Sequence, residues 1–245
     1  MRLGTIKQIL IITDGCSNMG ESPVAMASLA KEHGITVNVI GVVQEGKMGN
    51  DGMKEIEGIA LAGGGISQVV YATQLSQTVQ MVTHKAMTQT LQGIVNKQLK
   101  QILGNQETIE SLPPDKRGEI LEYVDEVSET SRLEVVILID CSASMSSKLD
   151  TVKESLFDLS ISLGARVGEN DYSIFVFPGK ETEVELVLDW NPNLQNISAI
   201  FSKLIVGGMT PTGPAIKQAI MQFRASAPIN RIVGYDEDYT ERTGY

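Results

Sequence analysis

The sequence predicts an α/β protein of the three-layer, doubly wound (Rossmann-like) class, with a mostly parallel six-stranded sheet and one antiparallel edge strand. Apolar runs rich in Val and Ile alternate with helical segments, which is typical of βαβ units. The runs at 8–14 and 133–139 are almost unbroken, which indicates strands buried on both faces of the sheet. A short connection at 178–180 between two later runs predicts the antiparallel pair.

The first half of the chain follows this pattern closely. Ser22 and Pro23 begin a helix that reaches His33, and Gly34 ends it. Gly63, Gly64 and Gly65 form a turn and lack the Lys-Ser/Thr of a phosphate-binding loop. The expected elements are strands at 8–14, 35–43, 67–71, 133–139, 172–177 and 183–190, and helices at 23–33, 53–62, 75–104, 114–127, 149–163, 196–204 and 215–223.

The helix at 75–104 is the longest expected element, about 40 Å at 1.5 Å per residue. Its apolar residues mostly share one stripe, which predicts an amphipathic helix. We expect this helix and the one opened by Pro113 and Pro114 to pack on the sheet; a dimerisation or partner arm is the alternative. The stripe comprises Leu75, Val79, Val82, Ala86, Leu91, Ile94, Val95, Leu99 and Ile102.

Composition narrows the class of protein. The 245 residues suffice for one large domain or two small ones, and the formal net charge is −10. That charge argues against nucleic acid, which requires clustered Lys and Arg. The N-terminus lacks the apolar region of a signal peptide and no apolar stretch could span a bilayer, so we expect a cytoplasmic protein without membrane insertion. Two cysteines exclude a disulfide framework or a Cys-rich zinc site.

The clearest chemical signal follows the strand at 133–139. Asp140, Ser142 and Ser144 stand at alternate positions directly after it. A carboxylate and hydroxyls in a tight loop suit a hard cation such as Mg2+, which takes oxygen ligands. The alternative is that Asp140 and Ser142 only cap the helix that follows.

Two further loops carry similar groups: Thr210 follows a double glycine, and Asp14 lies in the sequence Thr-Asp-Gly. Together the three loops resemble those of the von Willebrand factor A (vWA) domain family and its metal-ion-dependent adhesion site (MIDAS). The resemblance covers most of the chain and implies that Asp140, Ser142, Ser144, Thr210 and Asp14 bind the metal. Within the family, the chain looks like A-domain proteins of spore-forming bacilli.

The loops occur in a different order from the family's, because the Thr-Asp-Gly loop comes first. Residues 6–89 resemble the family's C-terminal half and residues 133–226 its N-terminal half. We therefore expect one circularly permuted domain over 1–227, with a helical linker at 90–132 and a loose acidic tail at 228–245. The strands ending at Asp14 and Asp140 would be neighbours at the centre of the sheet. A domain-swapped dimer is the alternative to the permuted monomer.

The resemblance implies a non-enzymatic module that binds Mg2+ or Mn2+ and receives a Glu or Asp of a protein partner at the metal. The expected rim comprises Met145, Met209, Ser17 and Asn18, with the loops 17–20 and 44–51. A metal-dependent hydrolase or phosphotransferase, or a scaffold with a vestigial site, are the alternatives. Cys16 and Cys141 fall in two of the loops, where packing or a redox pair are both open. His33 and His84 lack ligand-spaced partners and are interpreted as structural.

Overall fold

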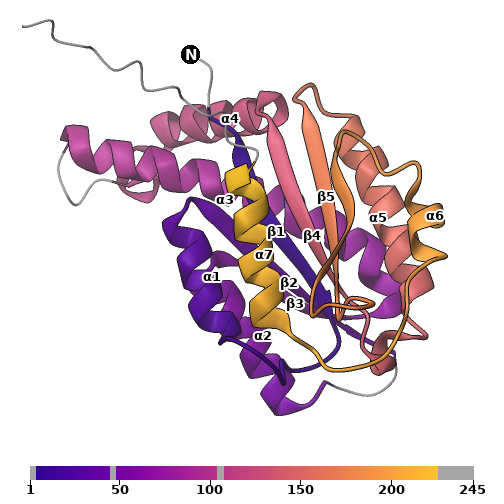
Figure 1. Cartoon of the computed structure of the whole chain (residues 1–245). Coiled ribbons are helices and arrows are strands. Elements are labelled where there is room, and N and C mark those ends of the chain that lie inside the picture. The colour runs from indigo at the N-terminus through magenta and orange to yellow at the C-terminus, as the bar shows by residue number, and fades with distance from the viewer. Residues whose placement is uncertain (1–3, 45–47, 104–107, 226–245) are drawn as a thin grey trace, which may run out of the picture.

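The computed structural model describes residues 4–44, 48–103 and 108–225 (Figure 1). Their strands form one sheet in the order β3-β2-β1-β4-β5-β6, and every neighbouring pair is parallel except β5 and β6. The predicted α/β class with one antiparallel edge strand is therefore confirmed. The strands are β1 (Ile6–Thr13), β2 (Ile35–Val43), β3 (Gly64–Tyr71), β4 (Leu133–Asp140), β5 (Asn170–Phe177) and β6 (Glu185–Asn191).

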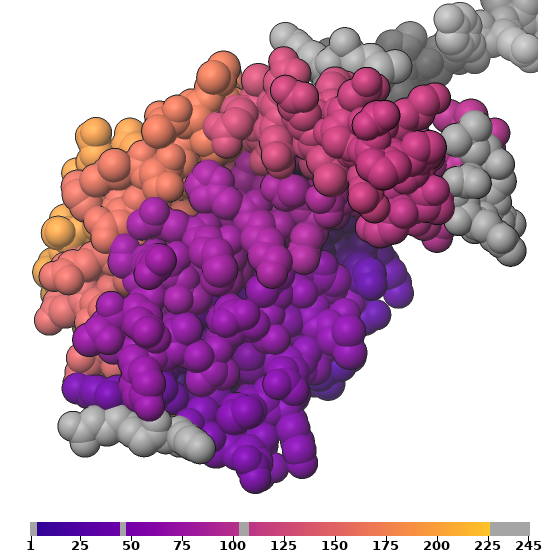
Figure 2. All heavy atoms as spheres, turned by 180° about the vertical axis from the view of Figure 1, so that it is seen from behind, coloured from indigo at the N-terminus to yellow at the C-terminus, as the bar shows by residue number. Residues whose placement is uncertain are grey.

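The helices lie in two layers that enclose two apolar cores. One core lies between the sheet and α3, α4, α5 and α6; the other lies between the sheet and α1, α2 and α7. Figure 2 shows the first of these faces, where the atoms of α3 lie beside those of α5 and cover the sheet beneath. The helices are α1 (Pro23–Glu32), α2 (Asn50–Ala62), α3 (Leu75–Leu103), α4 (Pro114–Thr130), α5 (Leu149–Gly164), α6 (Ile197–Phe201) and α7 (Thr212–Ala225), with short 3-10 turns η1 (Ala72–Gln74), η2 (Ile109–Ser111) and η3 (Ala143–Met145).

The central strands β1 and β4 are buried on both faces, as their apolar runs predict. In β1, Leu10 and Ile12 face the α3 side while Ile9 and Ile11 face the α1 side, and all four are fully buried. The two strands pair in parallel with Ile12 opposite Ile139. The expected adjacency of the Asp14 and Asp140 strands is confirmed, and the circular permutation stays a prediction. The expected acidic tail at 228–245 lies outside the described residues.

The start of α1 also agrees with its sequence signals. Ser22 is the N-cap, its hydroxyl accepts a hydrogen bond from the backbone N–H of Ala25 at 3.4 Å, and Pro23 is the first helical residue. Gly34 follows the helix with φ of +71°.

The glycine run before β3 is a turn, but strand pairing begins inside it. β3 starts at Gly64, three residues before the expected Ser67. Gly64 has φ of +66°, and a Cβ atom at Gly65 would lie 2.1 Å from the carbonyl oxygen of Val37 on β2. The close approach of the two strands therefore requires glycine.

The long helix α3 packs on the sheet only through its first part. The expected stripe is buried from Leu75 to Leu91, but Ile94 and Ile102 are 48% and 76% exposed. The prediction is wrong for these two residues, because α3 continues beyond the end of the sheet. Its last turns lie beside α4 and η2 instead, and this pair of helices projects from the domain (Figure 1).

A buried arginine fixes α4 to the sheet. Arg166 lies between α5 and β5, is 7% exposed, and donates to the backbone oxygens of Ser128 and Ser131, the latter at 2.8 Å. It also donates to the side chain of Asn170 at the start of β5. The guanidinium therefore satisfies carbonyl groups at the end of α4 that would otherwise be buried without a donor.

We predict that Arg166→Met lowers the free energy of unfolding by about 2–4 kcal/mol, because it leaves these carbonyl groups unpaired. Urea denaturation followed by circular dichroism measures the effect. Arg224→Met, at the exposed end of α7, is the matched control and should change stability by less than about 0.5 kcal/mol. Equal losses in the two variants would contradict this role of Arg166.

Candidate metal centre

The candidate metal centre lies where β1 and β4 end at the same edge of the sheet. Asp140 is the last residue of β4, and Asp14 directly follows β1. From this edge the chain passes to α1 on one face and to α5 on the other. Such a divergence opens a crevice beyond the strand ends, which is where open α/β sheets place ligand sites.

Asp140 is fully buried, and both carboxylate oxygens accept hydrogen bonds. Oδ2 accepts from the Thr13 hydroxyl at 2.6 Å, and Oδ1 accepts from the backbone N–H of Ser142 at 2.8 Å. Burial raises the pKa of Asp140, while these two hydrogen bonds act in the opposite direction. The carboxylate does not cap α5, whose N-cap is Lys148 and has no side-chain cap bond. The capping alternative for that helix is therefore wrong.

The loop that follows β4 and the loop that follows β1 are joined by a chain of hydroxyl contacts. The hydroxyl of Ser142 lies 3.2 Å from that of Ser144, and Ser144 donates to Oδ1 of Asp14 at 2.7 Å. These residues come from the two halves of the sequence. The structure therefore brings together four of the five predicted metal-binding residues, namely Asp140, Ser142, Ser144 and Asp14.

Lys148 is a component of this cluster that the sequence analysis missed. Its ammonium forms an ion pair with Oδ2 of Asp14 and donates to the backbone oxygen of Ser144 at 3.1 Å. The side chains of Lys148 and Asp14 are 10% and 4% exposed, so the pair is shielded from water. A lysine four residues after Ser144, one helical turn away, was the available signal.

The loop that carries Thr210 is held beside the other two loops through its backbone. Gly207 donates its N–H to the backbone oxygen of Cys141 at 2.9 Å. Thr210 is 6% exposed; its N–H donates to Oδ1 of Asn18 at 2.7 Å, and its oxygen accepts from the N–H of Asn18 at 3.2 Å. The hydroxyl of Ser17 also donates to that oxygen at 3.2 Å. Direct metal binding by Thr210 stays a prediction.

The expected rim is wrong in one place. Met145 is fully buried because η3 turns its side chain into the core on the α5 side, so it cannot contact a partner. Met209 is 51% exposed, as expected of a rim residue. Ser17 and Asn18 lie at the edge of the crevice, but their side chains hold the Thr210 loop. Of the expected rim loop at 44–51, residues 45–47 lie outside the described residues.

The two cysteines differ in their surroundings. Cys141 is fully buried, and burial together with the nearby Asp140 charge raises the pKa of its thiol to about 12. Cys16 is half-buried, and both thiols are free. Packing is the role that fits Cys141.

His84 was expected to be structural. Its Nε2 lies 3.4 Å from the Ser162 hydroxyl, and burial lowers the pKa of the imidazole.

The donor set of the cluster is oxygen only. Across residues 4–44, 48–103 and 108–225, no group of three or more His, Cys, Asp or Glu side chains is arranged to hold a metal ion. Two carboxylates with hydroxyl groups suit Mg2+ better than the soft metals that prefer thiolate or imidazole.

Across residues 4–44, 48–103 and 108–225, no helix is both long enough and apolar enough to cross a membrane.

Comparison with known proteins agrees with this fold. The model of the von Willebrand factor type A domain matches residues 1–103. "Uncharacterized protein YabS" of Bacillus subtilis (strain 168) is 63% identical over 223 residues, which is 91% of each chain. This relative agrees with the resemblance to A-domain proteins of spore-forming bacilli.

Two solved structures are also similar. The crystal structure of an uncharacterized protein from Alicyclobacillus acidocaldarius has a TM-score of 0.83 and 42% identity, covering 90% of this chain and 94% of its own. Proximal thread matrix protein 1 of the mussel byssus, described with a zinc-occupied MIDAS motif, has a TM-score of only 0.30 and 15% identity, covering 93% and 48%. At that similarity the zinc site is a property of the mussel protein alone. On the match to its domain model and to its relatives, the chain belongs to the von Willebrand factor type A domain family.

Proposed function

We propose that this protein is a non-enzymatic, divalent-metal-dependent module that binds an acidic side chain of a protein partner. The observation that carries the proposal is the hydrogen-bonded chain from Asp14 through Ser144 to Ser142, beside the buried Asp140. It places oxygen donors from distant parts of the sequence within one crevice. A metal-dependent interaction is also what the domain family suggests.

The side chains at this site fit a hard cation. The ammonium of Lys148 already sits among oxygens of Asp14 and Ser144, which supports a pocket that accepts positive charge. Asp140, Ser142, Ser144, Thr210 and Asp14 would hold Mg2+ or Mn2+. The bound metal would supply an electrophilic position for an outside carboxylate. Asp140, Asp14 and Lys148 together carry a net charge of −1, so a divalent ion would leave the site positive.

Exposed apolar side chains border the crevice. Asn18 and Thr210 are bonded to each other through the backbone, and their chain neighbours Met19 and Met209 are 39% and 51% exposed. Methionine side chains adapt to many partner surfaces. We infer that Met19 and Met209 take the rim role that Met145 cannot fill, and that they contact the partner around its acidic residue.

The direct test of the proposal is calorimetric titration of the full-length protein with Mg2+ and Mn2+. We expect the wild type to bind one ion and both Asp140→Ala and Asp14→Ala to lose detectable binding, because each removes a carboxylate of the same site. Asp115→Ala, on the exposed first turn of α4, removes the same charge elsewhere and should bind as the wild type does.

Metal binding that persists unchanged in Asp14→Ala would contradict the proposal that Asp14 and Asp140 belong to one metal site. A wild type that binds no ion would favour the vestigial scaffold. Phosphate ester hydrolysis that requires both Mg2+ and Asp140 would favour the enzyme alternative.

Lys148 gives a second prediction for the same measurement. Replacing it with Met removes a cation next to Asp14, so we expect Mg2+ to bind about tenfold more tightly, equivalent to about 1.4 kcal/mol. Lys153→Met is the control, because Lys153 pairs with Asp150 at the surface and its loss changes the net charge equally. Weaker Mg2+ binding by Lys148→Met would show instead that the ammonium positions Asp14 for the metal.

A further inference from the structure

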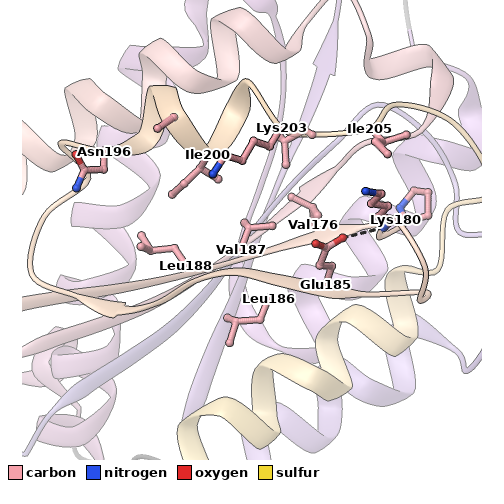
Figure 3. A pocket seen from close by; sticks show the side chains of 13 residues that line it. Val176, Lys180, Glu185, Leu186, Val187, Leu188, Asn196, Ile200, Lys203 and Ile205 are labelled. Atoms are coloured by element: carbon pink, nitrogen blue, oxygen red, sulfur yellow. Dashed lines mark hydrogen bonds between the residues drawn. The ribbon is translucent and has the colours of Figure 1, made fainter.

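A second hollow lies at the outer edge of the sheet, beside β6 (Figure 3). It has a volume of about 370 Å3, within the usual range of ligand pockets. In Figure 3, β6 forms one side of it, and α6 with the segment that follows forms the other. We call this hollow the β6 groove. Its long sides are apolar: Val176, Val187, Leu188, Ile200 and Leu204 all line it.

The apolar wall on β6 results from an irregular pairing with β5. Ile174 pairs with Leu188 and the next residue, Phe175, pairs with Leu186, so Val187 is an extra residue in β6. A bulge of this kind redirects side chains. Val187 and Leu188 both point toward α6, while Leu186 points away (Figure 3). The bulge also disfavours addition of a further regular strand, so a bound segment would be held mainly by side chains.

Two lysines give the groove a positive character. Lys180 and Lys203 line it and are exposed, and neither forms an ion pair with another described residue. The acidic residue between them, Glu185, accepts a hydrogen bond from the backbone N–H of Lys180 at 2.8 Å. In a protein of formal net charge −10, two unpaired cations over apolar walls favour an anionic, aliphatic ligand.

The groove is continuous with the face that carries the metal centre. Pro178 lines the groove and packs close to the Thr210 loop, where a Cβ atom at Gly208 would lie 3.2 Å from its Cγ. Between the two sites the chain exposes Ile205, Val206 and Met209 by 55%, 36% and 51%. Contiguous exposed apolar side chains mark protein interaction surfaces, which favours a peptide over a free small molecule.

We propose that the β6 groove binds an extended acidic segment of a protein partner. Aliphatic side chains of that segment pack against Val187, Leu188 and Ile200, and its carboxylates pair with Lys180 and Lys203. Groove binding does not require the metal. Only the added step, that one partner occupies both the groove and the metal centre, rests on the proposed function.

The test is selection of random 12-residue peptides displayed on phage against the full-length protein in EDTA, with counter-selection on Ala199→Trp. Ala199 lines the groove from α6 and is exposed, so tryptophan there fills the groove without disturbing the core. We expect enriched peptides to combine acidic and aliphatic residues. Synthetic labelled copies should bind at least tenfold more weakly to Lys180→Glu/Lys203→Glu and to Ala199→Trp, as measured by fluorescence anisotropy.

The double charge reversal Lys97→Glu/Lys100→Glu, at exposed positions of α3, changes the net charge equally and should leave binding unchanged. Thermal unfolding of each variant confirms that it is folded. Failure to enrich peptides over Ala199→Trp, or enrichment of peptides without acidic residues, would overturn the proposal. Decanoate binding in the absence of peptide binding would also overturn it and assign the groove to small amphipathic acids.

Peptides that bind in EDTA and bind Asp140→Ala equally well support the groove whatever the metal titration gives. A protein that binds Mg2+ but enriches no peptide loses the groove proposal alone. Peptide binding together with a failed Mg2+ titration would remove only the metal-dependent function.

Discussion

The pairing of β1 with β4 is the contact on which the rest of the structure depends. These strands come from different halves of the chain, yet they are paired from Ile6 and Leu133 to Ile12 and Ile139 at the centre of the sheet. Their side chains supply both apolar cores. The pairing also fixes the separation of Asp14 and Asp140, because Asp14 comes two residues and Asp140 one residue after the last pair, Ile12 and Ile139. One burial event therefore sets both the core and the chemistry at its edge.

Much of this arrangement was predictable from local patterns. Two unbroken apolar runs that end in Asp predict central strands with acids at one edge, and Ser22-Pro23 predicts where α1 begins. The features that sequence did not predict depend on contacts between distant elements. Helical periodicity contains no information on where the sheet ends, so Ile94 and Ile102 were expected to be buried. Met145 was expected at the exposed rim. It is buried because a 3-10 turn directs its side chain inward, and the apolar pattern does not reveal that turn.

Lys148 and the β6 groove show the same limit. The partner of Lys148 is 134 positions away along the chain, so its role emerges only when the Asp14 loop is placed beside α5. The groove depends on a bulge of a single residue at Val187, which a pattern of alternating apolar residues does not reveal. Lys148 belongs to the candidate metal centre, and the β6 groove is the second part of the proposed interaction surface. The Thr210 loop, held by Cys141 and Asn18, lies between them.

The ion pair between Lys148 and Asp14 has a consequence for how this domain folds. Two carboxylates at one crevice repel each other, and many small metal-binding domains remain unfolded until a cation neutralises such groups. Here the chain supplies that neutralising charge itself, from the turn that begins α5. The ion pair therefore lets the two carboxylates lie in one crevice with only one of them paired to a cation of the chain itself.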